Sequence, residues 1–434
     1  MSSRSAGSRI VAIDALRGLV MMLLLPDLSG GFSLYRMAEL HPQGAVWQAL
    51  GRQFTHAAWA GAHVWDFVMP GFVLLVGASM PLSVMARRAR GDTTAQLRLH
   101  AAIRSLALVV LGLLATRSVP DYFENAMPYL VILGIGLPCS AWLGRRLGLR
   151  TVAARLALDA AWAALVLGVA LGWMLTNLEG SGAYDLGQIL ILLGLAYLPA
   201  FLMVERGSLA QAAVAVGILA AYGGAFFIYA ATVVPPPASP WINGANFAAA
   251  VDRAFLNELP RALPYQDEPH GYHTLQFVPL IATMLAGMIA GRAMALSTDR
   301  AALAWRMAVV AAGLVAGGLV LGALGIPVIK SLWTPSWALL STGLLLLVLA
   351  VLYRACDVAG HVRWALPFTI LGSNAVLLYM MAVHDRWRLA GPWRRLLAGV
   401  VPADWWPLAE ALLVLATLWL LAWLLARRRL FIRL

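Results

Sequence analysis

The sequence predicts an all-α protein that crosses a membrane with a bundle of about 10 to 12 helices. Hydrophobic residues make up 61% of its 434 residues and charged residues only 12%, which is more apolar surface than one water-soluble core can bury. Apolar runs near the spanning length of a helix recur along the chain. The stretches between them are too short for an independent domain, so we expect a single transmembrane domain over residues 1–434.

The expected helices follow one another as about twelve apolar segments, give or take two. They cover residues 10 to 26, 63 to 86, 98 to 116, 126 to 144, 151 to 176, 186 to 204, 209 to 232, 273 to 294, 302 to 326, 336 to 353, 364 to 384 and 405 to 426. The first segment contains Asp14 and Arg17 and lacks a persuasive cleavage site. We therefore interpret it as a retained helix and not as a signal peptide.

The basic residues indicate how the bundle is oriented. The formal net charge of +12 comes mostly from arginines in short loops, which is typical of membrane topology and not of a nucleic-acid-binding stripe. We expect no nucleic-acid partner. The arginine bias predicts that both termini lie in the cytoplasm. The arginines between residues 386 and 395 fall on the opposite side, which fits either an interfacial segment or a miscounted helix.

Several classes of chemistry are not indicated. Cys139 and Cys356 both fall in or beside apolar runs, so neither a disulfide framework nor a metal-ligand spacing is present, and we expect no metal. The chain has no P-loop, Rossmann fingerprint, HExxH or GxSxG motif. These absences argue against nucleotide hydrolysis, hydride transfer, and zincin or serine-hydrolase chemistry.

A histidine and an aspartate ten residues apart are the strongest candidates for chemistry. His56 precedes Asp66, which stands at the start of an apolar run where a membrane begins. A neutral imidazole can accept a proton there, and a carboxylate can hold its tautomer. An interfacial histidine bound to a loop carbonyl, and a carboxylate placed favourably at a helix start, explain the same residues without chemistry. The sequence leaves both interpretations open.

Polar residues in the first segment allow two further readings. Asp14 and Arg17 are three residues apart, so they share a helical face and can neutralise each other; Arg17 could instead contact an anionic ligand. Asp27 ends the same segment just before two glycines. It is a candidate for contact with a substrate, although a turn role explains it equally well.

Two polar residues in the second half of the chain stand out. Lys330 is the only lysine, which suggests a point charge against a carboxylate or phosphate; snorkelling to the interface beside two tryptophans is the alternative. Asn374 follows Gly372 and Ser373 inside an apolar segment, where small residues suit helix packing but an amide needs a partner.

Long loops of the expected outer face hold the remaining candidates. The loop from residue 233 to 272 and its continuation contain amides, aromatics and hydroxyls suited to a sugar, among them Asn246 and His273. Trp59 lies close to His56 in the other long loop, residues 27 to 62. The same residues would also make an ordinary ordered loop.

Motifs along nearly the whole chain resemble one family of membrane enzymes. They are Ile13-Asp14-Ala15-Leu16-Arg17-Gly18, His56-x-x-Trp59-x-Gly61 running into Asp66-Phe67-Val68-Met69-Pro70, Gly77-Ala78-Ser79, Phe255-Leu256-Asn257 with Pro260-Arg261, Gly271-Tyr272-His273-Thr274-Leu275 with Ala282-Thr283-Met284, Lys330-Ser331-Leu332-Trp333-Thr334-Pro335-Ser336 and Gly372-Ser373-Asn374-Ala375. Together they resemble the bacterial relatives of heparan-alpha-glucosaminide N-acetyltransferase, which are transmembrane acyltransferases.

The resemblance implies transfer of an acetyl group from cytoplasmic acetyl-CoA to the amine of a glucosamine-type sugar at the outer side of a bacterial inner membrane. It implies that His56 is the catalytic histidine, and we expect Asp66 or Asp27 to orient it. A donor for the developing oxyanion is also needed. The expected contacts are, for the sugar, Asn246, His273, Trp59 and Asn374, and, for the coenzyme, Lys330 and Arg17.

The chain departs from the family at two points. Eukaryotic members use an asparagine in an Asn-Tyr-Gly-Gly context, where this chain has Asp27-Leu28-Ser29-Gly30-Gly31. The lysosomal members also carry an N-terminal lumenal region that this sequence lacks, so we expect an envelope sugar and not heparan as the acceptor. A transporter or flippase, and an O-acyltransferase of a cell-envelope glycan, remain alternatives. Apolar helix faces leave contacts with membrane lipid and a homodimer open.

Overall fold

The computed structural model describes residues 10–26, 32–115, 152–176, 186–233, 239–259, 264–266 and 272–431, and the regular structure within these ranges is entirely helical. The helices are α1 (Val11–Leu24), α2 (Leu34–Leu40), α3 (Ala45–Gln53), η1 (Val64–Phe67), α4 (Val68–Arg88), α5 (Thr94–Ala115), α8 (Val152–Thr176), α9 (Ile189–Leu202), α10 (Ser208–Thr232), α11 (Phe247–Leu256), η4 (Thr274–Gln276), α12 (Phe277–Leu296), α13 (Arg300–Ala323), α14 (Pro335–Leu352), η5 (Tyr353–Val358), η6 (Arg363–Ala365), α15 (Leu366–Leu371), η7 (Gly372–Asn374), α16 (Ala375–His384), α17 (Arg386–Leu396), η8 (Ala403–Trp405) and α18 (Trp406–Arg427). The predicted all-α class is confirmed for this part of the chain.

Eight helical stretches in the described ranges are long and apolar enough to cross a membrane. They are Val64–Arg88, Thr94–Leu114, Ser208–Thr232, Thr274–Leu296, Arg300–Ala323, Pro335–Val358, Arg363–Val383 and Ala403–Arg427. A polytopic bundle therefore fits the structure, but the predicted 10 to 12 spans are not reached among these residues.

Four expected segments account for the difference. Segment 151 to 176 forms α8, of which only Ala157–Val169 counts as an apolar helix among the described residues. Segments 10 to 26 and 186 to 204 form helices of only 14 residues each, α1 and α9. The expected helix from 126 to 144, which includes Cys139, lies outside the described residues. The single domain and the cytoplasmic termini stay predictions.

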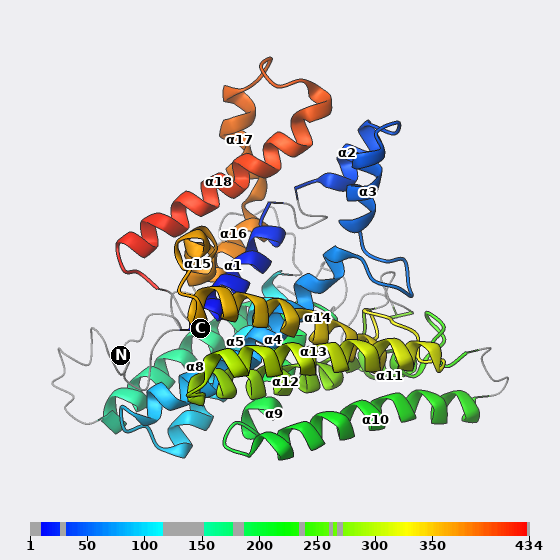
Figure 1. Ribbon diagram of the computed structural model, residues 1–434, viewed down its shortest axis with the longest axis vertical. Coiled ribbons are helices and arrows are strands. Elements are labelled where there is room, and N and C mark those ends of the chain that lie inside the picture. The colour runs from blue at the N-terminus through cyan, green and yellow to red at the C-terminus, as the bar shows by residue number, and fades with distance from the viewer. Residues whose placement is uncertain are drawn as a thin grey trace.

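Helices α4 and α12 pack closely along the centre of the larger group of helices (Figure 1). Small residues make this approach possible. A Cβ added to Gly77 would overlap the backbone of α12, and one added to Gly287 or Gly291 would overlap the backbone of α4. Glycine is therefore required where the two backbones touch. Since Asp66 and Gln276 immediately precede these helices, their packing fixes both residues relative to each other.

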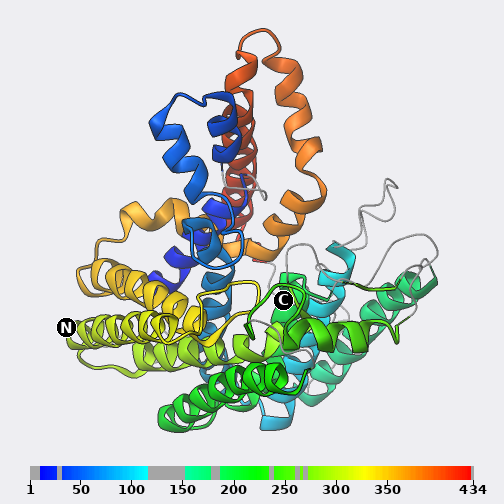
Figure 2. The same cartoon turned by 90° about the vertical axis from the view of Figure 1, so that its right-hand side faces the viewer.

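A second group of helices projects from the first. Helices α17 and α18 form an antiparallel arm, and α2 and α3 lie beside it in both views (Figures 1 and 2). The arginine-rich stretch that did not follow the predicted charge bias forms α17, a separate short helix. Arg394 and Arg386 of this segment both pair with Glu410 of α18. These two ion pairs hold α17 against α18.

Candidate active site

The loop that carries His56 is fixed to distant parts of the chain. It connects α3 to η1, and the amide of Gly61 donates a hydrogen bond of 2.8 Å to the carbonyl of Val328. Gly61 has a φ of 120°, a conformation that favours glycine. The indole of Trp59 donates to the carbonyl of Trp241 at 2.9 Å. The backbone around His56 is therefore held by partners on two other loops.

Asp66 is a buried carboxylate whose hydrogen bonds fix the end of this loop. It lies in η1, is 1% exposed, and accepts from the amides of Ala57 at 3.2 Å and His63 at 3.0 Å. Its Oδ1 lies 2.7 Å from Nδ1 of His56. Backbone amides and a ring nitrogen together satisfy a charge that would be costly if it were buried alone.

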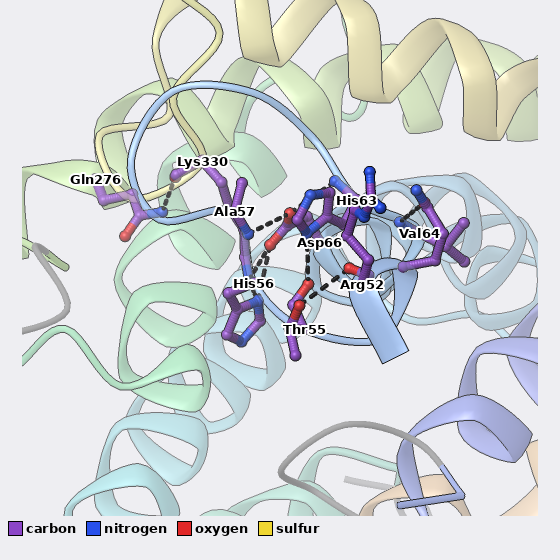
Figure 3. A network of polar contacts seen from close by, with 10 residues as sticks. Arg52, Thr55, His56, Ala57, His63, Val64, Asp66, Gln276 and Lys330 are labelled. Atoms are coloured by element: carbon purple, nitrogen blue, oxygen red, sulfur yellow. Dashed lines mark hydrogen bonds and ion pairs between the residues drawn. The ribbon is translucent and has the colours of Figure 1, made fainter. Parts of the chain in front are cut away.

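Lys330 completes the cluster from the loop between α13 and α14. Its Nζ lies 2.9 Å from Nδ1 of His56 and 3.3 Å from Oδ1 of Asp66 (Figure 3). The side chain is 9% exposed, and the ammonium lies 5.5 Å from the ring centroid of Tyr272. Lys330 neutralises the buried carboxylate of Asp66. Pairing with a carboxylate is one of the two contacts that the sequence suggested for this lone lysine.

The arrangement leaves one nitrogen of His56 available for chemistry. When Nδ1 carries the proton and donates it to Asp66, the neutral ring has a lone pair on Nε2. In that state Nδ1 has no lone pair for the Lys330 ammonium, which then donates to Oδ1 of Asp66 instead, and the side chain of His56 is 46% exposed. A proton can therefore be accepted at Nε2 from a molecule that approaches from outside the protein.

A second histidine–aspartate pair contains His273, the residue that follows Tyr272 in the sequence. Nδ1 of His273 lies 2.9 Å from Oδ2 of Asp252, and each side chain is 1% exposed. The amide of Thr274 donates to both oxygens of the same carboxylate, at 3.2 and 3.1 Å. In the described part of the chain, Nε2 of His273 is buried without a hydrogen-bond partner. The pair joins α11 to η4.

Asn246 has a clear local role at the start of α11. Its Oδ1 accepts from the amide of Ala249 at 3.0 Å, and its Nδ2 donates to the carbonyl of Ile242 at 2.9 Å. The residue is fully buried. This is the capping arrangement expected before an apolar helix. A contact between Asn246 and a sugar stays a prediction.

The sequence reasoning missed Gln276. Its Nε2 donates to the carbonyl of Lys330 at 2.9 Å, and its Oε1 is buried without a partner among the described residues. A glutamine near the start of an apolar segment was the available signal, because a buried amide needs partners. The contact helps to set the position of Lys330.

Arg17 and Asn374 form hydrogen bonds with residues outside the His56 cluster. Arg17 forms the expected pair with Asp14, at 3.2 Å, and also donates to Ser79 of α4 at 2.9 Å. Asn374 donates to the carbonyl of Leu430 at 3.2 Å. Asp27 lies outside the described residues. Their roles toward substrate or coenzyme therefore stay predictions.

No group of three or more His, Cys, Asp or Glu side chains suited to a metal ion occurs among the residues that the structure describes. The candidate site is instead a histidine, a carboxylate and an ammonium. Such a set can move protons and stabilise charge through hydrogen bonds.

Comparisons with known proteins report a distant relative. No protein-family model matches the chain. Heparan-alpha-glucosaminide N-acetyltransferase of Mus musculus is 29% identical over 119 residues, which are 27% of this chain and 15% of the mouse protein. The similarity supports a distant relationship to that family. It fits a transferase that lies in a membrane, and the short match carries neither substrate nor mechanism with it.

Proposed function

We propose that this protein is a membrane acyltransferase that moves an acetyl group from cytoplasmic acetyl-CoA to the amine of a glucosamine-type sugar at the outer side of the membrane. The observation that carries the proposal is the His56 ring, whose Nδ1 lies 2.7 Å from a buried aspartate and whose side chain is 46% exposed. The apolar helices and the distant N-acetyltransferase relative agree with it.

In the proposed reaction, His56 carries one proton from the attacking amine to the departing sulfur. The sugar amine attacks the thioester carbonyl, and a carbon–nitrogen bond forms while Nε2 takes the proton that the nitrogen loses. The carbon–sulfur bond then breaks, and the imidazolium returns the proton to the departing sulfur. Asp66 holds the ring in the tautomer that makes Nε2 the base. The products are an N-acetyl sugar and free coenzyme A, and His56 ends neutral.

The binding residues follow the earlier expectations. For the sugar, we propose Asn246, His273, Trp59 and Asn374, and for the coenzyme Arg17 and Lys330. Asp27 is a second candidate for orienting His56. We propose that the acceptor binds outside because the arginine bias predicts the His56 loop on the outer face.

The test is acetyl transfer by the purified protein in lipid nanodiscs. Acetyl-CoA with a labelled acetyl group is incubated with glucosamine, with N-acetylglucosamine as the matched control that lacks a free amine, and with glucose. We expect free coenzyme A and a labelled N-acetyl product with glucosamine alone. An ester product with glucose would favour the O-acyltransferase. Absence of turnover, with sugar uptake into proteoliposomes, would favour the transporter.

A further inference from the structure

One side of α17 is covered by α18, which runs alongside it (Figure 1). Ala390 is buried in an apolar cluster that includes residues of α18. The indole of Trp393 donates a hydrogen bond of 3.0 Å to the hydroxyl of Thr417 on α18. This packing leaves the other side of α17 uncovered by α18.

The uncovered side of α17 combines guanidinium groups with an indole. Trp387 is 66% exposed, the side chain of Arg394 is 60% exposed, and Arg395 is also exposed. The guanidinium of Arg388 lies 5.1 Å from the ring centroid of Trp387 and pairs with Asp385 at 2.9 Å. We call these three arginines and the tryptophan the arginine face of α17. Its partner must suit both apolar surface and positive charge.

The arginine face keeps an excess of positive charge at its C-terminal end. The sequence of α17 contains four arginines and no acidic residue. Glu410 of α18 is shared by Arg386 and Arg394. One carboxylate that is shared by two guanidiniums balances the charge of only one of them, and the neighbouring Arg395 adds a further positive charge. An anion is therefore favoured at this end of the helix.

The contacts between the two helices place these arginines where a membrane begins. The stretch Ala403–Arg427 is long and apolar enough to cross a membrane, and α18 starts at Trp406 within it. The guanidinium of Arg394 lies 5.9 Å from the ring centroid of Trp406 and donates to Glu410 at 2.8 Å. Tryptophan at the end of a span is typical of the headgroup level. Arg394 therefore reaches the lipid phosphates when α18 crosses the membrane.

We propose that the arginine face of α17 is a binding site for an anionic phospholipid. Arg394 and Arg395 hold the headgroup phosphate, because guanidinium groups bind phosphate oxygens with paired hydrogen bonds. Trp387 packs against the apolar part of the same lipid. A lipid is favoured over a protein partner because most of the adjoining span is uncovered in the described part of the molecule and itself needs lipid around it. The site does not depend on the proposed function.

Lipid binding at α17 can be measured on the full chain in detergent. The protein is incubated with phosphatidylglycerol or phosphatidylcholine, each with the same acyl chains and the same photoreactive group, so that the two lipids differ in headgroup charge. After illumination and digestion with pepsin, labelled peptides are quantified by mass spectrometry. The variants are Trp387→Ala, Arg395→Gln, and Arg394→Gln combined with Arg395→Gln. Arg52→Gln, at an exposed arginine of α3, is the matched control.

We expect phosphatidylglycerol to label residues 386–396 about fivefold more than phosphatidylcholine. Arg395→Gln should reduce this labelling about fivefold, as expected for the loss of one basic residue beside an anionic surface, and the double variant should reduce it tenfold or more. Trp387→Ala should reduce labelling by both lipids. Arg52→Gln should leave the labelling of α17 unchanged, and added salt should weaken the preference for the anionic lipid.

Three results would overturn the site. They are equal labelling of α17 by the two lipids, labelling by phosphatidylglycerol that persists in the double variant, and absence of label from both lipids, which would leave the face to a protein partner. Thermal unfolding identifies the variants that fold. Arg395→Gln keeps the test decisive if the double variant does not fold, because it leaves the pairing of Arg394 with Glu410 intact.

Discussion

The two histidine–aspartate pairs differ little in their hydrogen bond and greatly in their surroundings. The nitrogen–oxygen distance is 2.7 Å for His56 and Asp66 and 2.9 Å for His273 and Asp252. Both carboxylates also accept from backbone amides, but His56 is 46% exposed and has the Lys330 ammonium beside it, whereas His273 is 1% exposed. A hydrogen bond between an imidazole and a carboxylate therefore does not by itself identify a catalytic histidine. Access to the far nitrogen distinguishes the two pairs.

The largest expected effect is on acetyl transfer in His56→Ala. Loss of the base should lower kcat/KM by about 10²- to 10⁴-fold, while the half-exposed ring contributes little to stability. Transfer and thermal unfolding of the same preparation measure both effects. His361→Ala is a suitable control, because that histidine is exposed in another loop. Retained turnover in His56→Ala would remove His56 from the reaction.

The buried pair should respond in the opposite way. His273→Ala leaves the buried carboxylate of Asp252 without its ring partner, and a buried polar group that loses a hydrogen bond costs about 1 to 3 kcal/mol of folding free energy. We expect reduced stability in denaturant unfolding and, because His273 is also a proposed sugar contact, a higher KM for glucosamine with kcat per folded molecule largely kept. An unchanged KM in the folded fraction would remove His273 from the sugar site.

Asp66→Asn tests how far the exposed pair depends on charge. The amide keeps the shape of the carboxylate but cannot balance Lys330 or stabilise an imidazolium, so we expect transfer to fall by about 10²- to 10⁴-fold. Measurement of kcat and KM separately should place the loss in kcat. A variant as active as the parent would show that backbone contacts alone orient His56.

The smallest effect is expected at Trp59. Trp59→Phe removes the bond to the carbonyl of Trp241, a loss of about 1 kcal/mol. Thermal unfolding should show a small decrease, and the KM for the sugar reveals whether the indole also meets substrate. Trp305→Phe, at a side chain that is 72% exposed, is the matched control. A large rise in KM with unchanged stability would assign Trp59 to the acceptor site.

Sequence patterns anticipated the parts of this molecule that depend on local composition. Apolar segments such as 63 to 86 correspond to helices because the membrane selects for long apolar stretches. The short helices α2, α3 and α11 were not predicted, since each lies in a loop and has only 7 to 10 residues.

The candidate site could be predicted only in part, because some of its contacts join residues that are far apart in the sequence. His56 and Asp66 are ten residues apart, so their meeting could be anticipated. Lys330 reaches His56 across 274 residues of sequence, and only its being the sole lysine drew attention to it. Gln276 and the pairing of His273 with Asp252 depend on how loops pack in three dimensions. No spacing rule connects such residues.

The close contact between α4 and α12 sets a limit on side-chain volume far from the reacting groups. Gly77 is 11 residues beyond Asp66, about 16 Å along the helix, yet a methyl group there would force the two backbones apart. The start of α4 would then move away from the start of α12, and with it Asp66 from the lysine that Gln276 holds. Sequences that keep every polar residue of the site can therefore still lose its geometry, through a single larger residue in the apolar interior.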